Sequence, residues 1–319
     1  MNKKLVCHAI QLTILSTAVA VPRYAVAQEA ALEEIVVVAR RRSEDLQDVP
    51  IAVTAFTASD IASAGINRPQ DFVSLTPNVS MVDTANAGDT QVTIRGQVST
   101  RDAESTFAYV VDGVLITNPN GFNGELFDVE QIEVLKGPQG AIYGRNAVAG
   151  AIIINTKRPT DEFEAEVKGT LGDDDLRKGQ AMVSGPLIAD QLYGRLTMFY
   201  GESDGQFKNK FTGENDKVNY WEETAVRGRV IWEPSDRLSV DLIGSYREVK
   251  GGAINFNAVF ALPGAADFLG NPDLYGDVND HNFQYIFNVP GENEQDNSFF
   301  SLKTDYEMDF ATLTVTAAY

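Results

Sequence analysis

Apolar and polar side chains alternate along the second half of the chain. From residue 163 onward the alternation recurs in segments of about ten residues. In each segment every second residue is apolar and those between are polar, so a strand there would have one apolar and one polar face, and residues two apart share a parity. In one segment Leu196 and Met198 share a parity, while Arg195 and Thr197 take the other. We expect seven strands, a weaker one among them at 180–185, near residues 163–171, 180–185, 192–200, 226–232, 238–247, 300–306 and 313–319.

The connections between these strands alternate between short and long. The short ones lie near 186–191, 233–237 and 307–310, and the others lengthen along the chain, at 172–177, 202–220 and 250–296. A soluble β-sandwich also alternates, but tight turns at one end and long loops at the other are typical of outer-membrane barrels. Aromatic residues near the strand ends fit an interfacial girdle, namely Tyr200, Trp232, Tyr246 and Tyr306.

Residues 49–160 carry the shorter signals of an α+β domain. We expect strands at 50–57, 91–95, 107–111, 114–116, 132–135 and 151–155. A short helix capped by Thr57 or Ser59 runs to Ala64, and a second begins at Pro69 and ends before Pro77.

Glycines and their neighbours mark the turns of this domain. Gly137 and Gly144 have the spacing of a phosphate-binding loop, but Arg145-Asn146 replaces the Lys-Ser/Thr pair such a loop needs. Asp112 precedes Gly113 in a hairpin signal, so turn geometry explains it without a catalytic role. The predicted turn residues are Gly96, Asp112, Gly113, Gly137, Pro138 and Gly144.

The first 27 residues are typical of a secretory signal peptide. Lys3 and Lys4 precede a mostly apolar stretch, and Ala25-Val26-Ala27 supplies the small residues of a cleavage site. Cys7 is the only cysteine, so the mature chain would have none and fits the bacterial envelope better than a disulfide-stapled domain.

Composition narrows the classes of function. The net charge of −19 disfavours nucleic acid as a partner. One cysteine and two histidines leave little material for a metal site or a catalytic dyad, so we expect no resident cofactor or metal and no enzymatic activity. No apolar run reaches the roughly 18 residues of a membrane-spanning helix.

A β-prone peptide precedes the α+β domain. Residues 33–39 lie between acidic residues and the run Arg40-Arg41-Arg42, without an obvious local partner. Such a peptide is either an edge strand of the next domain or a strand donated to another protein.

An ordered set of motifs resembles the TonB-dependent outer-membrane receptors. The peptide Glu34, Ile35, Val36, Val37, Val38 and Ala39 resembles the TonB box, with Val38 where threonine is common. Segments similar to the family's plug domain are 48–53, 93–96, 111–114, 129–138 and 143–155. The resemblance covers residues 28–160. It implies a signal peptide (1–27), a TonB box and linker (28–48), an α+β plug domain (49–160) and the first strands of an antiparallel transmembrane β-barrel (161–319).

The same resemblance implies a function. A receptor of this family binds a scarce ligand at the bacterial outer membrane, most often a ferric siderophore, and the periplasmic TonB protein pairs with the box to drive uptake. Vitamin B12, haem and glycans stay open as ligands. The resemblance also implies that Arg95 and Arg145 pair with barrel carboxylates and hold the plug in place.

The length bears on how much of a receptor is present. Seven strands compare with about 22 in plugged transporters, so we expect the 319 residues to be the N-terminal part of a longer receptor. A truncated, non-transporting product and a soluble periplasmic binding module remain the alternatives. Membrane fractionation and heat-modifiable migration would separate them from an inserted barrel.

Overall fold

The computed structural model describes residues 36–37, 44–45, 50–83, 90–99, 104–117, 122–209, 218–253, 268, 284–285 and 291–319. The predicted signal peptide, Glu34, Ile35, Val38, Ala39 and most of the two longest predicted loops lie outside these residues. Within the described ranges, none of the helices has the length and apolar character needed to cross a membrane.

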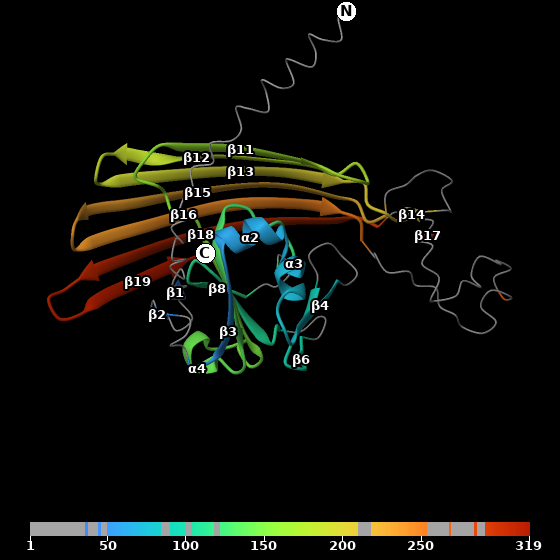
Figure 1. Cartoon of the computed structure of the whole chain (residues 1–319), viewed down its shortest axis with the longest axis horizontal. Helices are drawn as coiled ribbons and strands as arrows, with labels where there is room; N and C mark the ends of the chain where they lie inside the picture. The colour runs from blue at the N-terminus through green and yellow to red at the C-terminus, as the bar shows by residue number, and fades with distance from the viewer. Residues whose placement is uncertain are drawn as a thin grey trace, which may run out of the picture. The chain divides into compact units, whose positions relative to one another are not determined.

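The first half of the described chain, here called the α+β part (residues 50–160), contains two sheets (Figure 1). The larger has five strands, in the order β3 (Ala52–Thr57), β9 (Val129–Lys136), β10 (Gly150–Thr156), β7 (Phe107–Val111) and β8 (Val114–Ile116). Strand β10 runs parallel to β7, and the other neighbours are antiparallel. The smaller sheet contains β4 (Val79–Asp83), β5 (Thr90–Ile94) and β6 (Gln97–Val98), of which only β5 was predicted from the sequence.

Two predicted helices form where the capping signals place them. Helix α2 (Ala58–Ala64) begins after Thr57, whose hydroxyl accepts from the Asp60 N–H in a capping box, and ends at Gly65 with a φ of 68°. Helix α3 (Pro69–Ser74) has its proline in the first turn. A one-turn helix, α4 (Gly140–Tyr143), follows the predicted turn at Gly137.

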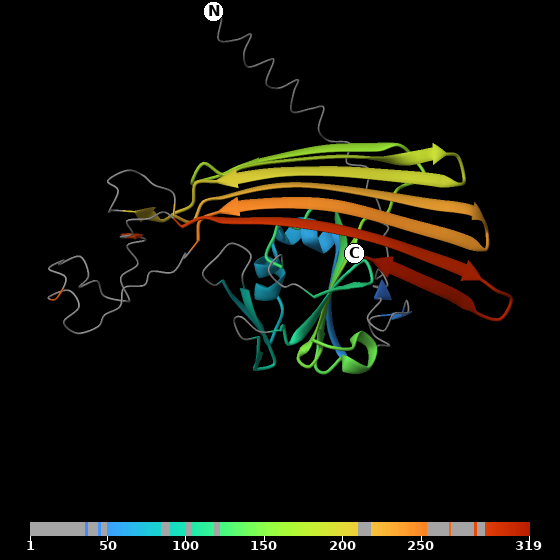
Figure 2. The ribbon, with the colours of Figure 1, turned by 180° about the vertical axis from the view of Figure 1, so that it is seen from behind.

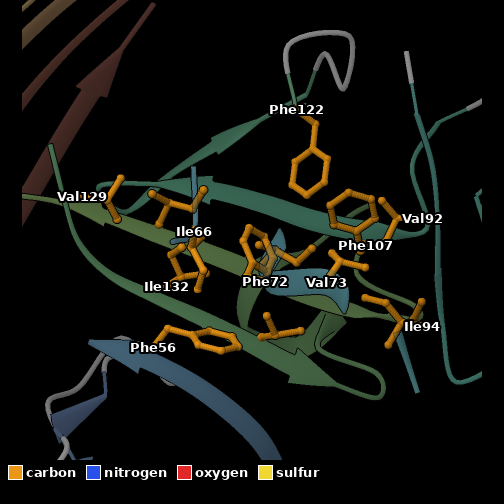
Figure 3. Packing of buried hydrophobic residues seen from close by; sticks show 14 residues of the cluster. Phe56, Ile66, Phe72, Val73, Val92, Ile94, Phe107, Phe122, Val129 and Ile132 are labelled. Carbon is orange, nitrogen blue, oxygen red and sulfur yellow. The ribbon is translucent and has the colours of Figure 1, made fainter. Parts of the chain in front are cut away.

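Both faces of the five-stranded sheet are covered. On one face α2, α3 and the smaller sheet enclose an apolar core, in which Phe122 and Phe107 lie side by side (Figure 3). Phe122 makes edge contacts with Phe107 and Tyr109 at centroid distances of 5.2 and 5.0 Å. On the other face Tyr143 of α4 and Val37 pack against Leu135. Coverage on both faces explains why β9 and β10 are largely buried.

The second half of the described chain is a seven-stranded antiparallel sheet, here called the wall. Its strands follow chain order, and Figure 2 shows their short turns at one end of the sheet. They are β11 (Glu164–Leu171), β12 (Arg177–Ile188), β13 (Leu192–Ser203), β15 (Trp221–Ser235), β16 (Leu238–Gly251), β18 (Asn293–Glu307) and β19 (Thr312–Ala318). All seven predicted strands are present, and several extend further than the alternation indicated. Two short strands, β14 (Lys208–Asn209) and β17 (Gln284–Tyr285), pair within the predicted long loops.

The wall buries its polar face and exposes its apolar face. In β13, Arg195 and Thr197 are 6% and 1% exposed, whereas Leu196 and Met198 are 40% and 52% exposed. In β18, Ser301 is buried and Phe300 lies on the outer side. This inverts the pattern of a soluble sheet and suits a wall with lipid outside and a polar lumen inside.

Candidate functional site

The peptide predicted to be the TonB box has a local strand partner. Val36 and Val37 form β1, which pairs antiparallel with β2 (Glu44–Asp45), so the expectation of a strand without a local partner is corrected. The Val37 side chain is fully buried on the five-stranded sheet. The other four residues of the predicted TonB box, Glu34, Ile35, Val38 and Ala39, lie outside the described ranges. The TonB box assignment as a whole therefore stays a prediction.

Arg95 and Arg145 lie on the α+β part. Arg95 adopts a φ of 51° in the β5–β6 turn, where its N–H donates to the Asn78 carbonyl at 2.9 Å. Arg145 Nη2 lies 3.7 Å from Glu104 Oε1, and both side chains are well exposed. Among the described residues neither arginine pairs with a wall carboxylate, so their role against the barrel stays a prediction.

Five of the six predicted turn residues have a positive φ. Asp112 and Gly113 have φ values of 48° and 83° and connect β7 to β8, as the hairpin signal indicated. Gly96, Gly137 and Gly144 also have positive φ, which only glycine adopts at little cost.

Asp128 joins the α+β part to the wall. Arg195 Nε donates to Asp128 Oδ2 at 2.8 Å, Arg195 Nη2 donates to Oδ1, and Thr197 Oγ1 donates to Oδ2 at 2.7 Å. Both members of this bidentate ion pair are 4% exposed. Such a buried, doubly hydrogen-bonded pair fixes position and orientation together.

The charge of Asp128 is set by competing effects. Burial alone would raise the pKa of its carboxyl, but the hydrogen bonds from Arg195 and Thr197 and the charge of Arg195 outweigh it and lower the pKa below the ordinary value. The pair is therefore ionised at neutral pH.

Glu125 is a second point of attachment. Its Oε1 accepts from Arg68 Nε at 2.6 Å and from Lys178 Nζ of β12 at 2.7 Å. Its carbonyl oxygen accepts from Arg247 Nη2 of β16 at 2.7 Å, and its N–H donates to Glu223 Oε2 of β15 at 3.3 Å. One residue thus contacts three wall strands.

Two neighbours shape the surroundings of Glu125. A methyl group at Gly124 would meet the guanidinium of Arg247, which would have to shift, so glycine permits this close approach. The Arg68 guanidinium carbon lies 4.3 Å from the ring centroid of Trp221, which holds it by a cation–π contact.

Arg229 of β15 makes the third attachment. Its Nε and Nη2 donate to the two carboxylate oxygens of Asp241 at 3.0 and 2.6 Å, while Nη1 donates to the Thr156 carbonyl at 2.9 Å. Nη1 also lies 3.7 Å from Asp112 Oδ1. Asp112 accepts from the N–H and the hydroxyl of Thr156, both at 2.9 Å, so it has a role beyond the turn.

Metal ligands do not gather in this interface. Within the described ranges, no group of three or more histidine, cysteine, aspartate or glutamate residues is placed to hold a metal ion. The acidic side chains of the interface face arginine and lysine instead, so the chemistry of the site is ion pairing.

A family comparison identifies the α+β part. Residues 45–151 match the model of the TonB-dependent receptor plug domain. The chain carries a TonB-dependent receptor plug domain. The fold class, a plug followed by antiparallel strands like the start of a receptor barrel, is therefore confirmed.

The matched curated proteins are named as receptors. The chain is 27% identical over 183 residues to the pesticin receptor of Yersinia pestis, covering 57% of this chain and 27% of the relative. It is 30% identical over 219 residues to the probable TonB-dependent siderophore receptor PirA of Acinetobacter baumannii, covering 60% of this chain and 28% of that protein. The chain thus spans a little over a quarter of the length of these relatives.

Solved structures show the same fold across plug and wall. The ferric yersiniabactin uptake receptor FyuA from Yersinia pestis matches with a TM-score of 0.73 and 19% identity, covering 84% of this chain and 40% of that one. The ferripyoverdine receptor of Pseudomonas aeruginosa matches with a TM-score of 0.67 and 16% identity, covering 86% of this chain and 34% of the other. At identities this low, the structural likeness establishes the fold alone.

Sequence reasoning missed the residues that attach the plug to the wall. It placed Arg195 among the polar residues of its strand, but it named no partner for Arg195. The signal was available, because a lumen-facing arginine needs an acidic partner and the segment before β9 supplies Glu125 and Asp128.

Proposed function

We propose that this chain is part of a receptor that takes up a scarce ligand across the bacterial outer membrane with energy supplied through TonB. The plug fills the lumen side of the wall and the apolar face of the wall contacts lipid. The observation that carries the proposal is the plug seated on the polar face of a wall whose other face is apolar, by the ion pairs of Asp128 and Glu125. The matched proteins are named as receptors and transporters, and we propose no catalytic residue.

A ferric siderophore is the ligand class that we propose. Support comes from the names of the relatives, which include a ferrichrome outer membrane transporter of Escherichia coli and a ferrioxamine B receptor of Salmonella typhimurium. Vitamin B12 is the second candidate, because a vitamin B12 transporter, BtuB of Vibrio vulnificus, is 27% identical over 228 residues.

Uptake of labelled ligands tests both candidates. The gene product would be expressed in bacteria that lack their own receptors, with TonB present or deleted, and offered ⁵⁵Fe-loaded yersiniabactin, ferrichrome or ferrioxamine B, or ⁵⁷Co-labelled vitamin B12. We expect accumulation of an iron complex only in cells with TonB. Accumulation of vitamin B12 alone would favour the second candidate, and equal accumulation with and without TonB would contradict the proposal.

Proline substitution tests the proposed TonB box. Pairing with TonB as an added strand requires backbone N–H groups, which proline lacks. We expect Ile35→Pro to abolish uptake while surface binding of the same ligand is unchanged. Val37 is a poorer position for this test because its buried side chain also supports the plug. Normal uptake by Ile35→Pro would exclude this box.

A further inference from the structure

A groove of about 370 Å³ lies on the outer, apolar face of the wall, close to the short turns. Strands β12, β13 and β15 line it, together with Phe163, which directly precedes β11. Each of these three strands is paired with a neighbour on both sides, so the groove lies over the interior of the sheet. Its volume is within the range of small-molecule sites, roughly 300–1,000 Å³.

Glycines form the floor of this groove. Gly185 and Gly194 are directly opposite each other in neighbouring strands, and Gly228 lies diagonally across from Gly194 on the next strand. A methyl group at Gly194 would approach Leu187 Cδ1 to 3.0 Å, so the leucine side chain lies beside this glycine. A methyl group at Gly228 would meet no atom within 4 Å. The floor is therefore open at Gly228.

Aliphatic side chains form the sides of the groove. Val183 and Leu196 lie opposite each other in β12 and β13, and both are exposed on the outer face. Leu187 is 64% exposed at the end nearest the turn. Burial of such side chains against an apolar molecule is favourable in proportion to the area covered.

The polar residues along the groove direct their side chains to the opposite face of the sheet. Arg195 donates to Asp128 and Arg229 donates to Asp241, both on the inner side, and Ser184 is buried. Among the residues that line the groove, none therefore presents a charged side chain to it. Because a polar guest would find no side-chain partner there, the groove suits an apolar occupant.

The position of the groove along the strands indicates which apolar molecule this is. Trp232 is exposed on the outer face of β15, two residues closer to the short turn than Val230 of the groove. Exposed aromatic side chains of membrane barrels lie at the level of the lipid headgroups, and the short turns are periplasmic. The groove thus extends from the headgroup level into the apolar region of the periplasmic leaflet, which in an outer membrane consists of phospholipids.

Two other occupants fit this groove less well. A two-fold contact with a second copy of the chain would place two identical hollows against each other and fill neither. A peptide adding itself as a strand needs an open edge, but both edges of β12, β13 and β15 are already paired.

We propose that the groove binds one acyl chain of a phospholipid from the periplasmic leaflet and holds that lipid on the wall. The chain replaces the side chains that the floor glycines lack. This site rests on the part of the proposed function that places the wall in the outer membrane, and it requires neither TonB nor the transported ligand.

Lipid titration of the full-length chain in detergent, followed by native mass spectrometry, tests the site. We expect one molecule of palmitoyl-oleoyl phosphatidylethanolamine to bind at least ten-fold more tightly than any further molecule. Phosphoethanolamine, which has the headgroup and no acyl chain, should not compete.

Filling the floor of the groove should remove the tightly bound lipid. In Gly228→Leu the new side chain would occupy the open floor, so we expect the first binding step to weaken to the level of the later ones. Gly179→Leu is the matched control, because Gly179 shares the outer face of β12 with Val183, lies outside the groove, and has no atom within 4 Å of an added methyl group. The control should bind the lipid as wild type does.

A second variant keeps the test decisive if Gly228→Leu does not fold. Leu187→Ala removes one side of the groove at an exposed position, so we expect folding to be unaffected and the Kd of the tight lipid to rise about ten-fold. Absence of a tight lipid in wild type, or an unchanged Kd in Leu187→Ala, would overturn the site. A dimer that forms in place of the lipid complex would also overturn it.

The outcome for the groove is separate from the outcome for uptake. A tight lipid that is lost in Leu187→Ala, in a protein that accumulates none of the labelled ligands, would support the groove and count against the transport function. Normal TonB-dependent uptake by a wild-type protein without a tight lipid would overturn the groove alone.

Discussion

At the scale of single residues, the attachment of the plug to the wall depends on a few buried charged side chains. Asp128 is the best defined, because both of its carboxylate oxygens accept hydrogen bonds from β13. Removing one partner of such a pair leaves the other charge buried and uncompensated, which costs more than loss of an exposed ion pair.

Asp128→Asn should therefore destabilise the protein. Asparagine tolerates the positive φ of 58° at this position, so the change removes charge without adding backbone strain. We expect a loss of about 2–3 kcal/mol in the free energy of unfolding, measured by denaturant titration in detergent. Asp174→Asn is the matched control, since Asp174 has a φ of 57° and is exposed. Equal stabilities of the two variants would contradict the assignment.

The same residue predicts a pH dependence. The pKa of Asp128 is lower in the folded protein than the value near 4 of a free carboxyl. The contribution of ionised Asp128 to the free energy of unfolding is fully present above the pKa of the free carboxyl and is lost as the pH falls through the folded pKa. We expect the stability difference between wild type and Asp128→Asn to be constant from pH 7 to about 5 and to shrink below about pH 4. A difference that disappears near pH 6 would show that another group is responsible.

At the scale of elements, the close approach of β16 to the segment before β9 depends on Gly124. In Gly124→Ala the new methyl group would displace the Arg247 guanidinium and break its hydrogen bond to the Glu125 carbonyl. We expect a lower thermal unfolding midpoint and faster proteolysis of the plug in Gly124→Ala. Gly140→Ala is the control, because a methyl group there meets open space. An unchanged midpoint in Gly124→Ala would show that Arg247 does not hold the plug.

Elements governed by local signals were predictable from the sequence. The cap at Thr57, the Pro69 start of α3 and the Asp112-Gly113 hairpin each act within a few residues, and all three form as expected. Strands β4 and β6 were missed because they are stabilised by pairing with β5 and not by a local signal. The attachments of Glu125 and Asp128 join residues far apart in sequence, so the sequence offered these acidic residues as candidate partners but its spacing could not pair them with Lys178 and Arg195.

At the scale of the whole molecule, the wall has a polar inner face and an apolar outer face. The inner face carries the arginines that hold the plug, and its outer face carries exposed apolar side chains such as Met198 and Leu302. A soluble sheet would reverse this arrangement. The polar face of the wall contacts the plug and its apolar face is left for lipid. This arrangement was predicted from the alternation of apolar and polar residues along each strand.

Spin labels along the wall test this arrangement most directly. The only cysteine, Cys7, lies in the predicted signal peptide, so labels can be attached to single cysteines introduced one at a time. In membranes, labels at Leu196, Met198, Phe300 and Leu302 should be relaxed by lipid-soluble oxygen, and labels at Ala225, Ile243 and Ser301 should be shielded. Outer positions that instead respond to a water-soluble nickel complex would contradict a lipid-facing wall around a plugged lumen.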